Sequence, residues 1–344
     1  MFKPKFFDRF CFWSIAAIII LFFLGGLVRI SGSGMGCPDW PKCFGTWIPP
    51  TSEAELPENY EQEYLEKRKV KVTRLAALLK RMGLTQKSEA LASVNGVMTS
   101  EPFNVQKTYT EYVNRLWGAL TGIITLLAAI SSFQYWKFKR TITLFTLLGV
   151  LFVIINGWLG SVVVDTDLLG GVVSIHFVMA FAAIASFMIA FYYNKKSEGN
   201  TTKSIKTLTI AGLILSIGQL LSGTSVRESI DQFGNSGVLI GLDNFDLLGG
   251  VFNTHRLLAL FTGLLLVYVF YLNRKTTNRP RTSIILLITI GFVVLQALTG
   301  ILNIRFEFPA IAQLMHVTIG SITLVSFIYL TIQELKSKNK EYGN

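Results

Sequence analysis

Apolar residues are concentrated in eight separate runs of about 20 residues, divided by shorter polar segments. A run of that length is long enough to cross the hydrocarbon core of a bilayer as an α-helix. With 51% hydrophobic residues and only 15% charged ones, the composition also differs from that of a soluble domain. The pattern predicts an all-α membrane protein with eight transmembrane helices. They are expected at residues 10–30, 109–133, 141–164, 172–193, 205–224, 251–272, 282–303 and 310–333.

Basic residues distinguish the two faces of the predicted bundle. Seventeen Lys and Arg residues fall in the two tails and the short loops on one side, whereas the short loops on the other side carry few. Both termini are therefore expected to be cytoplasmic. This asymmetry accounts for most of the net charge of +11, so we infer no nucleic-acid partner from it. The seventeen are Lys3, Lys5, Arg9, Lys137, Lys139, Arg140, Lys195, Lys196, Lys203, Lys206, Arg274, Lys275, Arg279, Arg281, Lys336, Lys338 and Lys340.

The first apolar run reads as a true membrane span, because it is too long for a signal peptide and lacks a small-residue cleavage site. No Arg- and Ser-rich transit segment precedes it, which favours the plasma (inner) membrane of a bacterium over an organelle. The first outer loop, residues 31–108, is long and basic. Leu75, Leu78, Leu79 and Met82 recur there at helical spacing, which predicts one or two surface helices. A solvated basic helix at the membrane surface is the simpler interpretation, and a specific binding function is the alternative.

The chain shows signs of internal duplication. Gly160 precedes His176 by 16 residues, and Gly300 precedes His316 by the same interval. Asn114-Arg-Leu opens the second predicted helix, and His255-Arg-Leu opens the sixth. These matches predict two tandem, pseudo-symmetric four-helix bundles, residues 1–200 and 201–344, related by an axis along the membrane normal.

The chain has three histidines, His176, His255 and His316, and each falls near the outer start of a predicted helix. An ionisable residue inside a membrane is a functional-site hypothesis by default. Two histidines on facing helices of a four-helix bundle can ligate both axial positions of a haem, which suits electron transfer. We expect His255 and His316 to form such a site. The alternative is a pair of core histidines bonded to neighbouring carbonyls.

The first half carries a different set, because Asn114 occupies the position that His255 fills in the second half. His176 is then the strong ligand, and Asn114 is a weak one at best. Glu111 lies one helical turn before Asn114 on the same face and can act as a general acid or base. The alternative is a carboxylate favoured by the helix dipole.

Arginines near the outer helix ends are candidates for pairing with haem propionates. Arg115 and Arg256 are the better candidates, because they directly follow the matched positions 114 and 255, and snorkelling to lipid headgroups is the alternative. The remaining candidates are Arg29, Arg227 and Arg305.

Cys37 and Cys43 lie six residues apart on the outer face, where an oxidising compartment makes a disulfide plausible. The pair can be structural or redox-active. Two cysteines without a nearby histidine do not complete a zinc site. Cys11 reads as a small apolar residue of the first span.

Several segments together resemble a known family. Residues 26–34, GLVRISGSG, and residues 37–43, CPDWPKC, are similar to the first outer loop of the haem A synthases. Residues 111–118, EYVNRLWG, resemble the Glu-x-x-His-Arg segment of that family, with Asn114 where histidine is common. The three histidines fall where the family places its remaining ligands, and the resemblance covers all eight helices.

This resemblance implies an oxidoreductase that converts a methyl group of haem O to a formyl group by successive water-derived hydroxylation, making haem A for terminal oxidases. It implies haem b as a cofactor on His255 and His316, substrate haem O near His176, and Glu111 as the catalytic carboxylate. The cysteine pair matches one found in some members. Expected partners are haem O, membrane lipid and an unidentified electron acceptor, together with haem O synthase and oxidase assembly factors. The alternatives are a haem b cytochrome that only transfers electrons and a haem carrier or assembly protein without catalysis.

Overall fold

The computed structural model describes residues 4–34, 36–37, 39, 42–81, 83, 85–97, 102–165, 170–193, 195–277 and 279–339. Within these residues the protein is helical and contains no strand. Of the residues discussed above, Lys3, Pro38, Trp40, Pro41, Met82 and Lys340 lie outside the described part. The α-helices are α1 (Pro4–Ile30), α2 (Tyr60–Arg81), α3 (Thr85–Val97), α4 (Val105–Ser132), α5 (Arg140–Asp165), α6 (Gly170–Tyr192), α7 (Lys203–Asn235), α8 (Gly249–Leu272), α9 (Pro280–Arg305) and α10 (Ala310–Lys336).

Eight of these helices, all except α2 and α3, are long and apolar enough to cross a membrane, which confirms the predicted fold class. Their ends agree with the apolar runs to within a few residues at most positions. The largest departures are α1, which begins six residues before the expected start at 10, and α7, which continues eleven residues beyond the expected end at 224. Its polar extension stays helical because Val226, Ile230 and Phe233 pack against Ile240 and Leu248.

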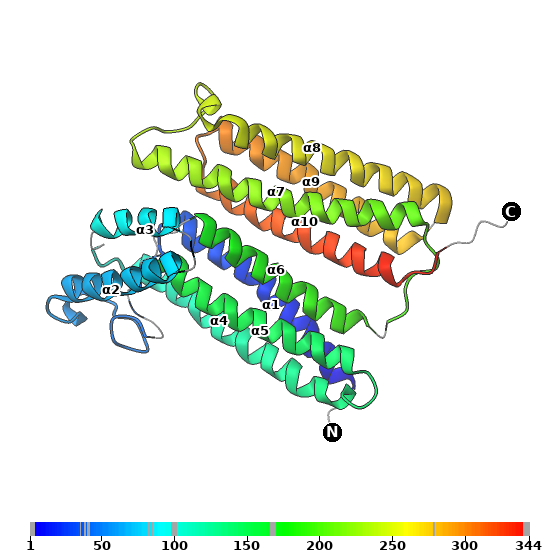
Figure 1. Ribbon diagram of the computed structural model, residues 1–344, viewed down its shortest axis with the longest axis horizontal. Helices are drawn as coiled ribbons and strands as arrows, with labels where there is room; N and C mark the ends of the chain where they lie inside the picture. Colours follow the sequence, from blue (N-terminus) through cyan, green and yellow to red (C-terminus); the bar gives the residue numbers. More distant parts are fainter. Residues whose placement is uncertain are drawn as a thin grey trace.

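The eight long helices form two groups of four, seen side by side in Figure 1. One group contains α1, α4, α5 and α6, and the other contains α7, α8, α9 and α10. The groups meet where α1 and α6 pack against α7 and α10. Both chain termini lie at one end of the bundle, here called the terminal end, and α2 and α3 lie at the other, here called the loop end (Figure 1).

Small residues allow the helices to approach closely, as is common where helices pack within a membrane. A Cβ atom on Gly149 of α5 would lie 2.9 Å from the ring of Phe187, and Gly212 of α7 leaves similar room for Phe327. Phe22 of α1 stacks on Phe181 of α6 with ring centres 4.6 Å apart. These contacts fix the positions from which the loop-end side chains project.

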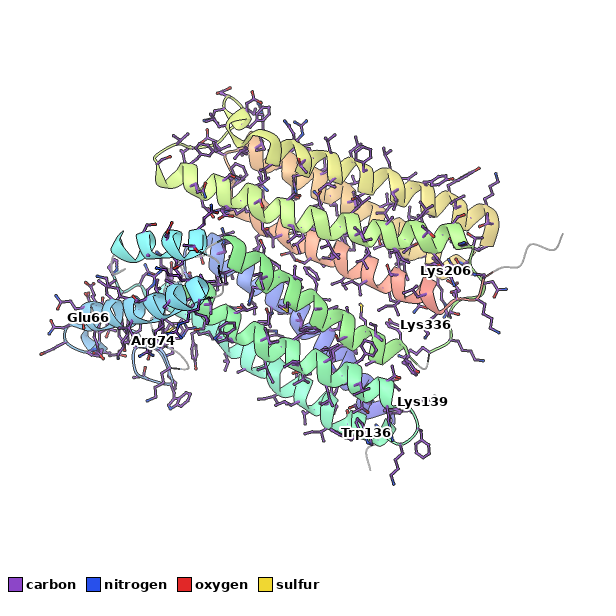
Figure 2. All side chains as sticks on the ribbon, viewed as in Figure 1. Glu66, Arg74, Trp136, Lys139, Lys206 and Lys336 are labelled. Carbon is purple, nitrogen blue, oxygen red and sulfur yellow. A yellow bond between two sulfur atoms is a disulfide. The ribbon has the colours of Figure 1, made fainter. Side chains whose placement is uncertain are left out.

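Basic side chains lie at the terminal end of both groups of helices (Figure 2). Lys139 directly precedes α5 of the first group, and Lys206 and Lys336 lie on α7 and α10 of the second. A buried ion pair also lies there: Arg279 contacts Glu334 at 2.5 Å, and the two side chains are 4% and 2% exposed. The terminal end thus carries the charges that the sequence assigns to the cytoplasmic loops.

The long loop between α1 and α4 contains two helices, as its leucine spacing predicts. Val72, Ala76 and Leu91 form a small core between α2 and α3, with Leu75 and Leu79 packed against it. Leu78, expected on the same stripe, is 47% exposed. The helix pair therefore has its own core at the loop end.

Candidate functional site

His255 of α8 and His316 of α10 meet inside the second group of helices. Their ring centres are 6.2 Å apart, and the ring planes are inclined by 56°. Two opposed metal–imidazole bonds of about 2 Å, with about 1 Å more from each nitrogen to its ring centre, require a separation of roughly 6 Å. The pair is therefore spaced to hold one metal between the two rings.

Hydrogen bonds place the proton on Nδ1 of each imidazole ring. His316 Nδ1 donates to the carbonyl of Gln296 at 3.0 Å, because a carbonyl oxygen can only accept. Ser222 Oγ donates to the carbonyl of Gln219 and therefore accepts from His255 Nδ1, also at 3.0 Å. Nε2 of each neutral ring keeps its lone pair. Such outer partners typically orient metal-binding histidines.

The same short sequence pattern surrounds both rings. Residues 219–223 of α7 read QLLSG, and residues 296–300 of α9 read QALTG. In each case the hydroxyl contacts Nδ1, and the final glycine faces Cε1 of the histidine on the next helix. A Cβ on Gly223 would lie 3.0 Å from His255, and one on Gly300 would lie 3.3 Å from His316. These polar residues inside apolar runs are the signal that the sequence interpretation missed.

His176 of α6 has a simpler environment in the first group. A Cβ on Gly160 would lie 3.5 Å from Cε1 of His176, which repeats the glycine–histidine contact of the second group. The Asn156 backbone occupies the place that corresponds to Gln296, but His176 Nδ1 is buried without a hydrogen-bond partner among the described residues. Asn114 Oδ1 is likewise buried and unpaired within the described structure. The first-group ring is thus less firmly fixed.

Across the described residues, no three His, Cys, Asp or Glu side chains converge on a point that could hold a bare metal ion. A metal between two imidazoles therefore needs further ligands from another molecule, and a porphyrin supplies four nitrogens. The residues at this position fit a haem better than a structural ion.

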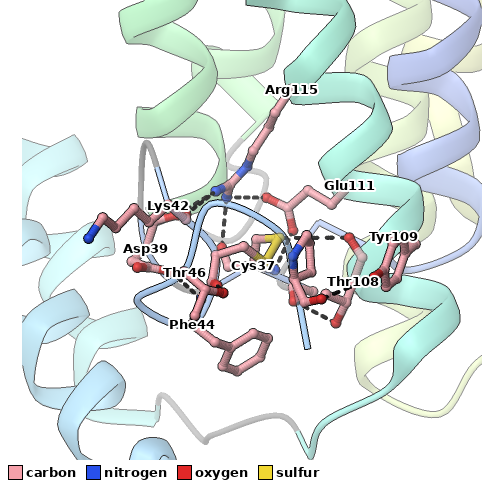
Figure 3. Close-up of a disulfide and its surroundings, with 12 residues drawn as sticks. Cys37, Asp39, Lys42, Phe44, Thr46, Thr108, Tyr109, Glu111 and Arg115 are labelled. Carbon is pink, nitrogen blue, oxygen red and sulfur yellow. Dashed lines mark hydrogen bonds and ion pairs between the residues drawn. A yellow bond between two sulfur atoms is a disulfide. The ribbon is translucent and has the colours of Figure 1, made fainter. Parts of the chain in front are cut away.

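Glu111 of α4 is 2% exposed and lies against the loop that contains the cysteines (Figure 3). Its Oε2 accepts a hydrogen bond of 2.8 Å from the backbone N–H of Cys37, and its Oε1 pairs with Arg115 one turn along the helix. Arg115 also donates to the carbonyls of Cys37, at 2.7 Å, and Asp39. The expected disulfide between Cys37 and Cys43 is present.

The disulfide loop sits directly on the backbone of α4. Thr108 Oγ1 donates to the carbonyl of Gly36 at 2.9 Å. A Cβ on Gly36 would lie 2.6 Å from the carbonyl group of Lys107 and 2.7 Å from the nitrogen of Thr108, so only glycine fits without a shift. The loop, Glu111 and Arg115 therefore form one connected unit, which we call the loop clamp.

The other arginine candidates occupy different surroundings. Arg256 is exposed, with its guanidinium 5.5 Å from the ring centre of Phe252, and Arg305 is exposed at the end of α9. Arg29 and Arg227 instead meet at the junction of the two groups, where both contact Asp231.

Fold and site together describe an eight-helix membrane protein whose second half presents two facing, hydrogen-bonded histidines. Comparison with known proteins gives the particular family. The family model described as cytochrome oxidase assembly protein matches residues 8–80 and 72–328, and the chain belongs to this family.

Similar proteins include a heme A synthase of Shewanella oneidensis, which is 20% identical, with 94% of this chain and 96% of the relative covered. A heme A synthase of Rickettsia prowazekii is 22% identical over 93% of this chain and 96% of its own length. A heme A synthase from an Exiguobacterium species is 20% identical over 99% of this chain and 96% of its own length. The similarity is distant in sequence but covers nearly the whole chain.

Proposed function

We propose that this protein is a haem A synthase that oxidises a methyl group of haem O to a formyl group. Family membership and the names of its relatives support haem A biosynthesis. The observation that carries the proposal is the contrast between the two halves. The second half has two histidines with fixed tautomers, suited to a permanent cofactor, and the first has one less constrained histidine, suited to a substrate that must leave.

In this proposal haem b is the cofactor, and it supplies one-electron transfer when bound between His255 and His316. Gln219 Nε2 lies 3.2 Å from His255 Nε2, so this contact would have to be released for the imidazole nitrogen to hold the haem. Ser222 and the Gln296 carbonyl hold the rings in place and keep each Nδ1 protonated.

Haem O is the proposed substrate, with His176 as its iron ligand and Asn114 as a weaker candidate on α4. Conversion of a methyl to a formyl group consumes one water and releases four protons and four electrons, which pass to an acceptor outside this chain. Glu111 is the proposed acceptor of protons. Arg115 pairs with its carboxylate, and the Cys37 N–H holds the second oxygen, so the group is kept in one orientation.

The membrane orientation belongs to the same proposal. Basic residues at the terminal end are typical of a cytoplasmic face, which puts the loop end and the histidines toward the outside of a bacterial plasma membrane. Haem O synthase is then the natural donor of substrate, and oxidase assembly factors are the natural acceptors of product.

Co-expression with a source of haem O, followed by pigment extraction and chromatography, tests the activity. The wild type should accumulate haem A. Glu111→Gln keeps an acceptor for the Cys37 N–H but removes the titratable group, so haem A should fall by roughly 10²-fold with cofactor haem retained. Glu66→Gln, an exposed carboxylate on α2, is the matched control.

Unchanged haem O in wild-type cells that retain low-spin haem would contradict the proposal. That result would favour an electron-transfer cytochrome or a carrier. Normal conversion by Glu111→Gln would remove Glu111 from the chemistry while leaving the rest of the proposal in place.

A further inference from the structure

Arg29 of α1 and Arg227 of α7 converge on a single carboxylate. Arg29 pairs with Asp231 Oδ2, and Arg227 contacts Oδ1 at 2.7 Å. Asp231 lies on α7, so the Arg29 contact crosses from the first group of helices to the second. Arg227 also donates to the side chain of Gln313 on α10. Three helices from both groups therefore meet at this point.

The two arginines are equivalent in the sequence. Residues 28–31 of α1 read VRIS, and residues 226–229 of α7 read VRES. Each arginine lies near the loop end of the first long helix of its group. Four residues after Arg227 comes Asp231, whereas four residues after Arg29 comes Ser33. One carboxylate thus serves two matched guanidinium groups.

The position of this arginine pair relative to the histidines is informative. Arg227 lies four residues, about 6 Å, beyond Gly223, which faces His255. Gln313 lies three residues before His316 on α10, again one turn toward the loop end. The pair therefore lies one helical turn beyond the two rings, between the helices that carry or contact them.

Both guanidinium groups have donors left over. Arg29 Nη1 and Arg227 Nε are buried and have no hydrogen-bond partner among the described residues. A buried N–H without a partner costs free energy, so such donors call for an acceptor. Arg115, by contrast, is committed to Glu111 and to loop carbonyls.

We propose that Arg29 and Arg227 form a carboxylate clamp for a propionate of the haem between His255 and His316, so that the first half completes the site of the second. This inference rests on the proposed haem site. A propionate at the edge of a macrocycle held by the two rings would lie toward the loop end and accept from both unpaired donors. Charge-assisted bonds between guanidinium and carboxylate are strong and directional.

The test compares two probes on purified protein: iron protoporphyrin IX and its dimethyl ester, which lacks free carboxylates. The readout is the rate of haem transfer to excess apomyoglobin. We expect the wild type to release the ester roughly 10- to 100-fold faster than the acid, which is the range for losing a charged hydrogen bond. Arg227→Gln and Arg29→Gln should release both probes at the same fast rate. Arg74→Gln, an exposed arginine on α2, should behave as wild type.

If the wild type released iron protoporphyrin IX and its dimethyl ester at equal rates, the proposed carboxylate clamp of Arg29 and Arg227 would be overturned. This outcome does not depend on any variant folding. An acid–ester difference that persists in both arginine variants, or one that is abolished by Arg256→Gln instead, would also overturn the clamp. Failure of the haem site itself would look different: His255→Ala would leave the low-spin spectrum unchanged, or the wild type would bind no low-spin haem.

Discussion

Replacing Gly36 with alanine should separate the disulfide loop from Glu111. The new Cβ would lie 2.6 Å from backbone atoms of Lys107, and these atoms are fixed within α4. Restoring an ordinary contact of 3.4 Å requires the loop to move by about 0.8 Å. The Cys37 N–H, now 2.8 Å from Glu111 Oε2, would then lie at about 3.6 Å, beyond hydrogen-bonding distance.

A displacement of that size at a reacting group can cost up to about 10²-fold in rate, so we expect haem A formation to fall by roughly 10- to 100-fold. The extracted haem A to haem O ratio measures this loss, and alkylation after mild reduction reports whether the disulfide has become more accessible. Gly34→Ala is the matched control, because nothing lies within 4 Å of a Cβ at that position. Haem A formation at the wild-type level in Gly36→Ala, with unchanged thiol accessibility, would refute the idea that the loop holds Glu111 for catalysis.

Three further predictions concern other parts of the molecule. His316→Ala should remove the low-spin haem b spectrum, because one axial ligand is lost; a retained spectrum would exclude His316 as a ligand. His176→Ala should deplete haem O from purified protein far more than Asn114→Ala, as measured by pigment extraction; equal depletion would make Asn114 as much a ligand as His176. Glu334→Gln should destabilise the protein by about 3–5 kcal/mol, because it leaves the buried Arg279 uncompensated. Thermal unfolding in detergent measures this, and replacing both partners with apolar residues should cost less than the single change.

The fold could be predicted because each membrane span is a local property of the chain. An apolar run of sufficient length has no alternative to a helix in lipid, since every backbone polar group must be satisfied internally. The end of α7 was wrong for the same reason. Arg227, Glu228 and Asp231 interrupt the apolar run, and the segment stays helical because it packs against Ile240 and Leu248 of the following loop, which hydropathy alone does not show.

The site could be predicted only in part. Three histidines in apolar surroundings stand out in a sequence, and so does a pair of cysteines. The partners of Arg115 in the loop do not stand out, because they are backbone carbonyls 73 to 78 residues away, and loop geometry leaves no periodic signal. The repeated QxL(S/T)G pattern is present in the sequence but was missed, because its role becomes clear only when each hydroxyl is seen to contact an imidazole.

The contact between Arg29 and Asp231 also constrains the order in which the molecule is made. The two residues are 202 positions apart. At translation rates of about 5–20 residues per second, Asp231 is synthesised roughly 10–40 seconds after Arg29. During that interval α1 must be retained by its own neighbours, through the Trp117 indole bonded to the Ala17 carbonyl and the stacking of Phe22 on Phe181. The earlier half therefore has to be stable in the membrane first, and the later half closes onto a surface that is already in place.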